Sequence, residues 1–110
     1  MKARIPGGMD KGGMIKRIQQ MQEDMERIQA EVEESVFTAS AGGGAVEAEV
    51  NGKHELLGIR IQPDVVDADD VEMLQDMILV AVNESIRKAS EAMDKGMEAA
   101  KGGLSIPGLF

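Results

Sequence analysis

Histidine and cysteine, which often serve as nucleophiles, bases or zinc ligands, are almost absent from this 110-residue sequence. His54 is the only histidine and there is no cysteine, so neither a second imidazole nor a thiolate can join it at a metal or catalytic site. Nucleophilic catalysis needs a nucleophile paired with a base, and His54 is better explained as a strand residue beside a turn. The sequence therefore favours a protein that is not an enzyme, with no catalytic residue, metal site or cofactor.

A run of acidic residues between positions 64 and 72 would bind calcium if it matched an EF-hand loop. That loop requires glycine at its sixth position and glutamate at its twelfth. Counted from Asp64, those positions hold Asp69 and Gln75, so the motif fails. The run suits the start of a helix instead, where Asp67 or Asp69 can accept hydrogen bonds from free amides and acids favour the positive end of the helix dipole.

A run of three glycines, Gly42 to Gly44, has the composition of a loop that cradles phosphate. A P-loop continues with Gly-Lys-Ser/Thr and a helix. Here Ala45 and an alternating segment typical of a strand follow. The run is therefore better interpreted as the loop of a β-hairpin.

Positive charge is concentrated at the N-terminal end of an acidic chain. The first seventeen residues carry a net charge of +4, whereas the whole chain carries −8. Lys11, Lys16 and Arg17 fall at the start of a predicted helix, where each cation opposes the helix dipole by about 0.3–1 kcal/mol. A bound anion such as phosphate would reverse that cost. The simpler alternative is a solvated tail that aids solubility.

A long helix is predicted to carry these basic residues. Apolar side chains recur at intervals of 4, 3, 4, 3 and 4 residues, which is heptad spacing, and polar residues fill the other faces. The pattern predicts one helix over about residues 11–34, roughly 35 Å long. We call its apolar stripe the heptad seam; its members are Met14, Ile18, Met21, Met25, Ile28 and Val32.

Three strands are predicted after this helix. Residues 35–41 include β-branched and aromatic side chains that favour strands, and residues 46–50 and 57–61 alternate between apolar and other side chains. Asn51-Gly52 predicts a type I′ hairpin turn, which needs positive φ at both positions. Together these segments predict a three-stranded antiparallel meander.

A second apolar stripe, from Val71 to Met93, predicts a second long helix that Gly96 ends or kinks. Asn83 interrupts the apolar side of this helix, so we expect it to be buried with its amide hydrogen-bonded. The element order is therefore αβββα, an α+β fold with the meander between two long helices. We assign residues 1–110 to one domain, with segments 1–10 and 102–110 expected to be flexible.

The first helix is too long for its own sheet to cover. Three strands span only about 15 Å, less than half the predicted helix length. An uncovered apolar seam is a surface for association, and a symmetric dimer is the simplest solution. We therefore predict a homodimer whose interface is the heptad seam.

Taken together, these segments resemble the YbaB/EbfC family of bacterial nucleoid-associated DNA-binding proteins. The glycine loop before a strand, the Asn-Gly turn, the proline after the third strand and an LxDxIxxAxN segment follow the family's order and spacing. The stretches that carry the resemblance are MIKRIQQMQEDMERIQAEVEES, AGGGAVEAEVNGKHELLGIRIQPDVV, DDVEMLQDMILVAVNESIRKASE and the closing PGLF.

The resemblance implies a dimer shaped like tweezers with projecting helices, which binds double-stranded DNA with little sequence preference and without catalysis. It also implies a cytoplasmic, nucleoid-associated protein linked to recombination, replication or gene regulation. We choose the DNA-contacting residues on charge alone, from the basic helix ends. They are Lys2, Arg4, Lys11, Lys16, Arg17, Arg87, Lys88, Lys95 and Lys101.

Two other functions compete with DNA binding. The first is a protein-interaction adaptor for a recombination or replication protein, with incidental DNA contact. The second is a helix that lies on a membrane surface, since the first helix has basic residues and an apolar face. That helix lacks tryptophan, and its middle and end are acidic. The longest apolar run, Met77 to Val82, is also far shorter than the roughly 20 residues of a membrane span, so we expect no membrane partner.

Overall fold

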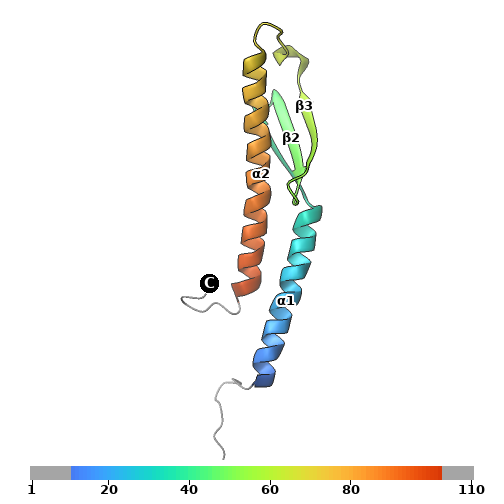
Figure 1. The fold of residues 1–110 in the computed structure, drawn as a ribbon, viewed down its shortest axis with the longest axis vertical. Coiled ribbons are helices and arrows are strands. Elements are labelled where there is room, and N and C mark those ends of the chain that lie inside the picture. The colour runs from blue at the N-terminus through green and yellow to red at the C-terminus, as the bar shows by residue number, and fades with distance from the viewer. Residues whose placement is uncertain (1–10, 103–110) are drawn as a thin grey trace, which may run out of the picture.

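The computed structural model describes residues 11–102 and contains two long helices and one small sheet (Figure 1). The three strands pair antiparallel in the order β1-β2-β3, so the predicted αβββα order and the meander are confirmed. The bounds predicted for the first helix, 11–34, match the structure. The elements are α1 (Lys11–Glu34), β1 (Val36–Ala41), β2 (Val46–Asn51), β3 (Leu56–Ile61), the 3-10 turn η2 (Pro63–Val65) and α2 (Val71–Lys101).

The hydrophobic core lies between α2 and the sheet. Val46 and Ala48 of β2 and Ala81 of α2 are fully buried. Leu74 and Ile78 of α2 pack around them and are partly buried. The small side chain of Ala81 lets the helix approach the middle strand closely, so α2 is held against the sheet along its N-terminal half.

The rest of α2 continues past the sheet and lies beside α1, which runs antiparallel to it (Figure 1). The two helices approach closely at Gly96, where a Cβ atom would lie only 2.5 Å from Cγ2 of Ile28. The helix continues unbroken through Gly96 to Lys101, so the predicted break is wrong. This glycine is explained by the contact between two helices, which the sequence of one helix does not reveal.

The β2–β3 loop is not the predicted type I′ turn. Among the described residues, His54 is the only non-glycine with positive φ, at 67°, and Gly52 is not among the glycines that have it. Asn51 and Gly52 therefore lack the dihedral angles of a type I′ turn. Instead, the Asn51 side-chain oxygen accepts hydrogen bonds from the amides of Lys53 at 2.9 Å and Glu55 at 3.0 Å, which organises a longer loop.

Glycine is required at position 52 because the backbone of α1 lies too close for a side chain, and not because of the backbone angles of Gly52 itself. A Cβ atom at this position would lie 1.9 Å from the carbonyl oxygen of Val32, in the last turns of α1. That oxygen belongs to a helix backbone, so it cannot move aside as a flexible side chain can. The hairpin tip is therefore seated directly on the C-terminal end of α1.

The start of α2 is capped by a different aspartate from those predicted. Asp70 is the N-cap, and its carboxylate accepts a hydrogen bond from the amide of Met73 at 3.2 Å. Asp67 accepts from the amide of Asp69 at 2.9 Å and so organises the preceding turn. The prediction of an acidic helix start was right in kind, but Asp67 and Asp69 as caps were wrong because the helix begins only at Val71.

The buried polar residue of α2 is Ser85, not Asn83. Asn83 is exposed in this chain, which contradicts the expected burial. Ser85 is fully buried and its hydroxyl donates to the carbonyl oxygen of Val82 at 2.7 Å. Serine can satisfy its hydroxyl within its own helix, so it enters the contact with the sheet at little cost.

The seating of the hairpin on α1 can be tested with two glycine variants. Gly52→Ala should lower the free energy of unfolding by about 1–3 kcal/mol, the usual cost of overpacking, because its Cβ meets the Val32 backbone. Gly58→Ala in β3 is the matched control, since nothing lies within 4 Å of a Cβ there; it should change stability by less than about 0.5 kcal/mol. Urea unfolding measures both, and equal effects would refute the close contact.

Candidate nucleic-acid interface

The N-terminal end of α1 projects beyond the end of α2 (Figure 1). Lys11, Lys16 and Arg17 lie on this projecting end and are all exposed. No acidic residue occurs within positions 11–22, so this stretch carries a net charge of +3. We call residues 11–22 the basic tip. The helix provides no acidic side chain in its first turn, which leaves the positive end of its dipole open to an anion.

The acidic part of α1 begins just after the basic tip and is partly neutralised there. Asp24 accepts hydrogen bonds from Arg27 at 2.9 Å and from Gln20 at 3.1 Å. Arg27 also lies 3.7 Å from a carboxylate oxygen of Glu31. These pairs partly neutralise Asp24 and Glu31, whereas Glu23, the acid nearest to the basic tip in sequence, is exposed.

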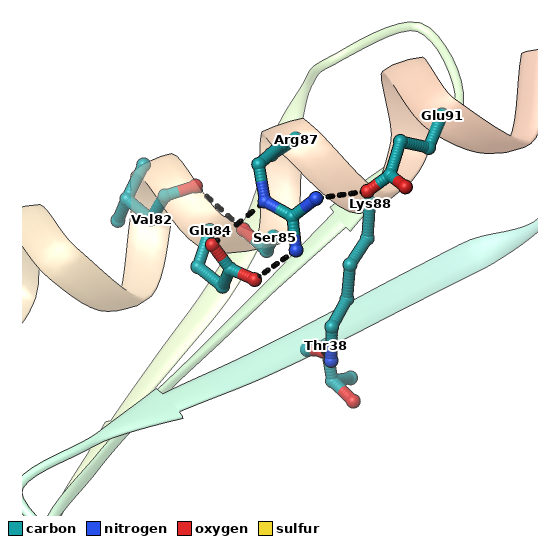
Figure 2. A network of polar contacts seen from close by, with 7 residues as sticks. All are labelled: Thr38, Val82, Glu84, Ser85, Arg87, Lys88 and Glu91. Carbon is teal, nitrogen blue, oxygen red and sulfur yellow. Dashed lines mark hydrogen bonds and ion pairs between the residues drawn. The ribbon is translucent and has the colours of Figure 1, made fainter. Parts of the chain in front are cut away.

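Arg87 is already bound to carboxylates on both sides. Its guanidinium donates to Glu84, one turn earlier, and to Glu91, one turn later (Figure 2). The hydrogen bond from Arg87 holds the pKa of Glu84 below its ordinary value, and the same carboxylate raises the pKa of Arg87. The group of three carries a net negative charge, so Arg87 is poorly placed to attract a phosphate.

Lys88 reaches across to the sheet. Its ammonium group donates to the backbone carbonyl oxygen of Thr38 at 2.8 Å (Figure 2). Because β1 is an edge strand of the three, this bond occupies a polar group on a strand that would otherwise be open to another chain. The lysine is exposed, yet its charge is directed at β1 rather than into solvent.

The remaining basic candidates lie near the C-terminal end of α2 or outside the described residues. Lys95 is exposed, and Lys101 lies in the last turn, where a cation suits the helix dipole. The structure brings these two to the same end of the molecule as the basic tip, because α1 and α2 run antiparallel (Figure 1). Lys2 and Arg4 lie outside the described residues.

His54 forms a hydrogen bond that sequence reasoning missed. Its Nε2 atom lies 3.1 Å from the hydroxyl oxygen of Ser90 on α2. A serine–histidine pair is part of a catalytic triad, but a triad also needs an orienting acid and an oxyanion hole. No carboxylate within residues 11–102 is seen bonded to the other ring nitrogen, and Ser90 lies in mid-helix, where amides bond to the helix. The pair is best explained as a clamp between the hairpin tip and α2.

The glycine loop and the acidic run have structural explanations too. All three glycines have positive φ, between 64° and 94°, which glycine adopts without strain and which turns β1 tightly into β2. No cluster of metal-binding side chains is found among residues 11–102. Neither helix in that range combines the length and hydropathy that crossing a membrane requires.

The heptad seam of α1 is divided between two environments. Met21, Met25, Ile28 and Val32 are half-buried on the part of α1 that lies beside α2, whereas Met14 and Ile18 on the basic tip are 47% and 40% exposed. Although the sheet is too narrow to cover this stripe, α2 of the same chain lies against part of it. The need for a partner therefore applies chiefly to the projecting end of the seam.

A second apolar surface lies on β3. Ile59 and Ile61 pair with Ala48 and Val46, which are fully buried, yet they remain 37% and 36% exposed. One helix about 10 Å wide covers only about two strands spaced 4.8 Å apart. We call Leu56, Ile59 and Ile61 the β3 surface. A register shift beside Val50 aligns Leu56 with the two isoleucines, where the sequence had suggested Leu57.

Comparison with known proteins identifies relatives along almost the whole chain. Residues 7–104 match the model of the YbaB/EbfC DNA-binding family. A nucleoid-associated protein of Clostridium novyi is 52% identical over 104 residues, which are 94% of this chain and 91% of that protein. A nucleoid-associated protein of Thermoanaerobacter pseudethanolicus is 50% identical over 109 residues, 99% of this chain and 98% of that protein.

A solved structure shares the fold. The crystal structure of an uncharacterized protein from Helicobacter pylori aligns with a TM-score of 0.64, covering 88% of this chain and 99% of that one. The two sequences are 22% identical, so this likeness concerns the fold alone.

The bond from Lys88 to β1 predicts a role in preventing sheet-to-sheet association. Lys88→Met keeps an unbranched side chain of similar length but removes the donor, so the β1 edge should pair more readily with other chains. Static light scattering should show a mass that rises with concentration above that of the parent. Lys95→Met is the matched control, with the same charge change at an exposed site on α2; equal behaviour of the two variants would contradict this role.

Proposed function

The chain belongs to the YbaB/EbfC DNA-binding family, and from this premise we propose that it is a dimeric nucleoid-associated protein that binds double-stranded DNA with little sequence preference. The observation that supports the binding mode is the basic tip, with three exposed cations and no acid among residues 11–22. The names of the relatives from Clostridium and Thermoanaerobacter support a cytoplasmic location on the nucleoid.

The chemistry of the basic tip suits phosphate rather than base recognition. Lysine and arginine at a helix start provide charge and donors for phosphate oxygens, and such contacts position a protein without reading sequence. Lys16 and Arg17 are adjacent in sequence, so they point to different sides of the helix and can reach different phosphates. Arg87 and Lys88 belong to the charge-based set, but their existing bonds make them secondary contacts in this proposal.

An acidic protein can bind DNA in this way because its charges are separated in space. The tip around Lys16 lies about 27 Å from the end of α1 at Glu34, at about 1.5 Å per residue. The screening length at physiological salt is about 8 Å, so repulsion from the acidic sheet is largely screened at the tip. The same repulsion grows when salt is diluted, since the screening length then approaches 30 Å.

We propose that the dimer forms through the β3 surface. Leu56, Ile59 and Ile61 form an apolar row on an edge strand that α2 leaves uncovered, and a two-fold axis would let two copies cover each other. The exposed end of the heptad seam, Met14 and Ile18, is another apolar surface, and Leu79 and Val80 of α2 are also exposed. A dimer through β3 leaves both basic tips free, which doubles the number of cations available to one duplex.

The β3 surface also supports a second candidate function, a protein-interaction adaptor for a recombination or replication protein. An apolar row on an edge strand is a common site for pairing with an extended segment of another protein. In that case DNA contact would be incidental. A gel-shift assay with a random duplex at physiological salt separates the two functions: a shift at micromolar dimer supports DNA binding, and its absence favours the adaptor.

The DNA contact itself can be tested by salt dependence. Two copies of Lys11, Lys16 and Arg17 would neutralise up to about six phosphates, which predicts a slope near −5 in a plot of log K against log salt, at about −0.9 per phosphate. Changing all three to Gln should flatten the slope and weaken binding to every duplex about equally. Fluorescence anisotropy from 0.05 to 0.3 M salt measures this, and unaltered affinity of the triple variant at 0.15 M would place the contact elsewhere.

The dimer interface can be tested by placing charge on each apolar surface in turn. Ile59→Lys with Ile61→Lys should give folded monomers, because two buried cations would face each other across the axis. Met14→Lys with Ile18→Lys should leave the dimer intact. Light scattering gives the mass and circular dichroism checks folding. If only the Met14→Lys and Ile18→Lys pair gave a monomer, the interface would be the heptad seam and not the β3 surface.

A further inference from the structure

Two glycines outside the basic tip fix the direction in which α1 points. Gly52 seats the hairpin on the last turns of α1, where a Cβ would lie 1.9 Å from the Val32 carbonyl oxygen. Gly96 lets α2 lie against the middle of α1, where a Cβ would lie 2.5 Å from Cγ2 of Ile28. Most of the basic tip projects beyond the end of α2 (Figure 1).

Ile28 cannot easily move out of the way of a larger residue at position 96. Its Cγ2 is attached directly to Cβ, and β-branched side chains in a helix have one strongly preferred χ1 rotamer. The contrast is Gly42, where a Cβ would also lie 2.5 Å from a neighbour, but that neighbour is the Sδ atom of Met77. Methionine is unbranched and adaptable, so it can yield. At Gly96 the helices themselves must separate.

Because α1 is held near its C-terminal end by these two contacts, a small displacement at Ile28 becomes a larger displacement at its N-terminal end. Val32 is held by the hairpin and lies four residues from Ile28, or about 6 Å at about 1.5 Å per residue. Lys11 lies twenty-one residues from Val32, or about 32 Å. Ordinary contact between carbon atoms is at about 3.5 Å, so a Cβ at Gly96 would push Ile28 away by roughly 1 Å. A rigid α1 would then carry Lys11 about 5 Å from its present place.

We infer that Gly96 is a positioning residue that sets the direction of α1 and, through it, the place of the cations on a duplex. The consequence for DNA rests on the proposed function. An ion pair requires nitrogen and oxygen to lie within about 4 Å, so a 5 Å displacement takes a cation out of reach of its phosphate. In a dimer both tips move, and their separation no longer matches the phosphates that they contact together.

Spin labels measure the direction of α1 directly. The chain contains no cysteine, so labels attach only where cysteine is introduced; Gln19→Cys on α1 and Asp94→Cys on α2 are both at exposed sites. Labelled chains are unfolded and refolded with a large excess of unlabelled chains of the same genotype, so that each dimer holds one labelled copy. Gly96→Ala should lengthen the distance by roughly 3 Å, since Gln19 lies about 20 Å from Val32 along the helix.

Two further variants separate positioning from a general loss of folding. Gly102→Ala adds the same methyl group to the end of α2 where nothing lies within 4 Å, so its distance should equal that of the parent. Combining Gly96→Ala with Ile28→Ala removes the opposing Cγ2, which should return the distance to the parent value. Circular dichroism of each variant checks that both helices remain formed.

DNA affinity is then measured on the unlabelled chains with one duplex at 0.15 M salt. Gly96→Ala should weaken binding severalfold, and the double variant should recover most of it. An unchanged label distance in Gly96→Ala overturns the inference, as does a changed distance with unchanged DNA affinity. If the parent itself fails to bind the duplex, the proposed function fails, whereas the label distances still decide whether Gly96 directs α1.

Discussion

The packing of α2 is the constraint on which the rest of the structure depends. This helix alone contacts both the sheet and α1, since its N-terminal half covers β1 and β2 and its C-terminal half lies beside α1 (Figure 1). Small residues make both contacts close: Ala81, Ser85 and Ala89 are fully buried, and Gly96 admits Ile28. Because one straight helix serves both partners, the sheet and α1 are aligned along a single axis.

That alignment determines which surfaces remain free. A single helix covers two strands and leaves the third, so the β3 surface stays exposed. The helix also ends at Lys101, short of the start of α1, so most of the basic tip extends beyond it (Figure 1). The β3 surface and the basic tip lie toward opposite ends of the molecule (Figure 1). The proposed dimer interface at one end and the proposed DNA site at the other would therefore not compete, as a dimer with two free arms requires.

The order of elements could be predicted from sequence, whereas contacts between elements could not. Periodicity identified α1 and the meander because it depends only on neighbours along the chain. The bonds of Arg87 to Glu84 and Glu91 lie three and four residues apart and could have been predicted from helical spacing. Lys88 and Thr38 are fifty residues apart, and the reasons for Gly52 and Gly96 lie in α1. No local pattern reveals such partners. Selection by charge alone therefore included Lys88, whose ammonium group is already hydrogen-bonded to the sheet.

The separation of charge along α1 also bears on the proposed binding to DNA. The helix carries three of its four basic side chains within residues 11–22 and all six of its acidic side chains after residue 22, so a duplex that met the tip end-on would contact only positive charge. A duplex that lies along the helix would meet Glu23, Asp24 and Glu26 about 10 to 15 Å from Lys16 along the helix axis, which is roughly one to two screening lengths of about 8 Å. In the proposed binding mode these acids therefore disfavour side-on contact and make the tip the more favourable approach. The direction of the tip then decides which phosphates it reaches, and that direction is set by the two glycine contacts at the other end of the helix.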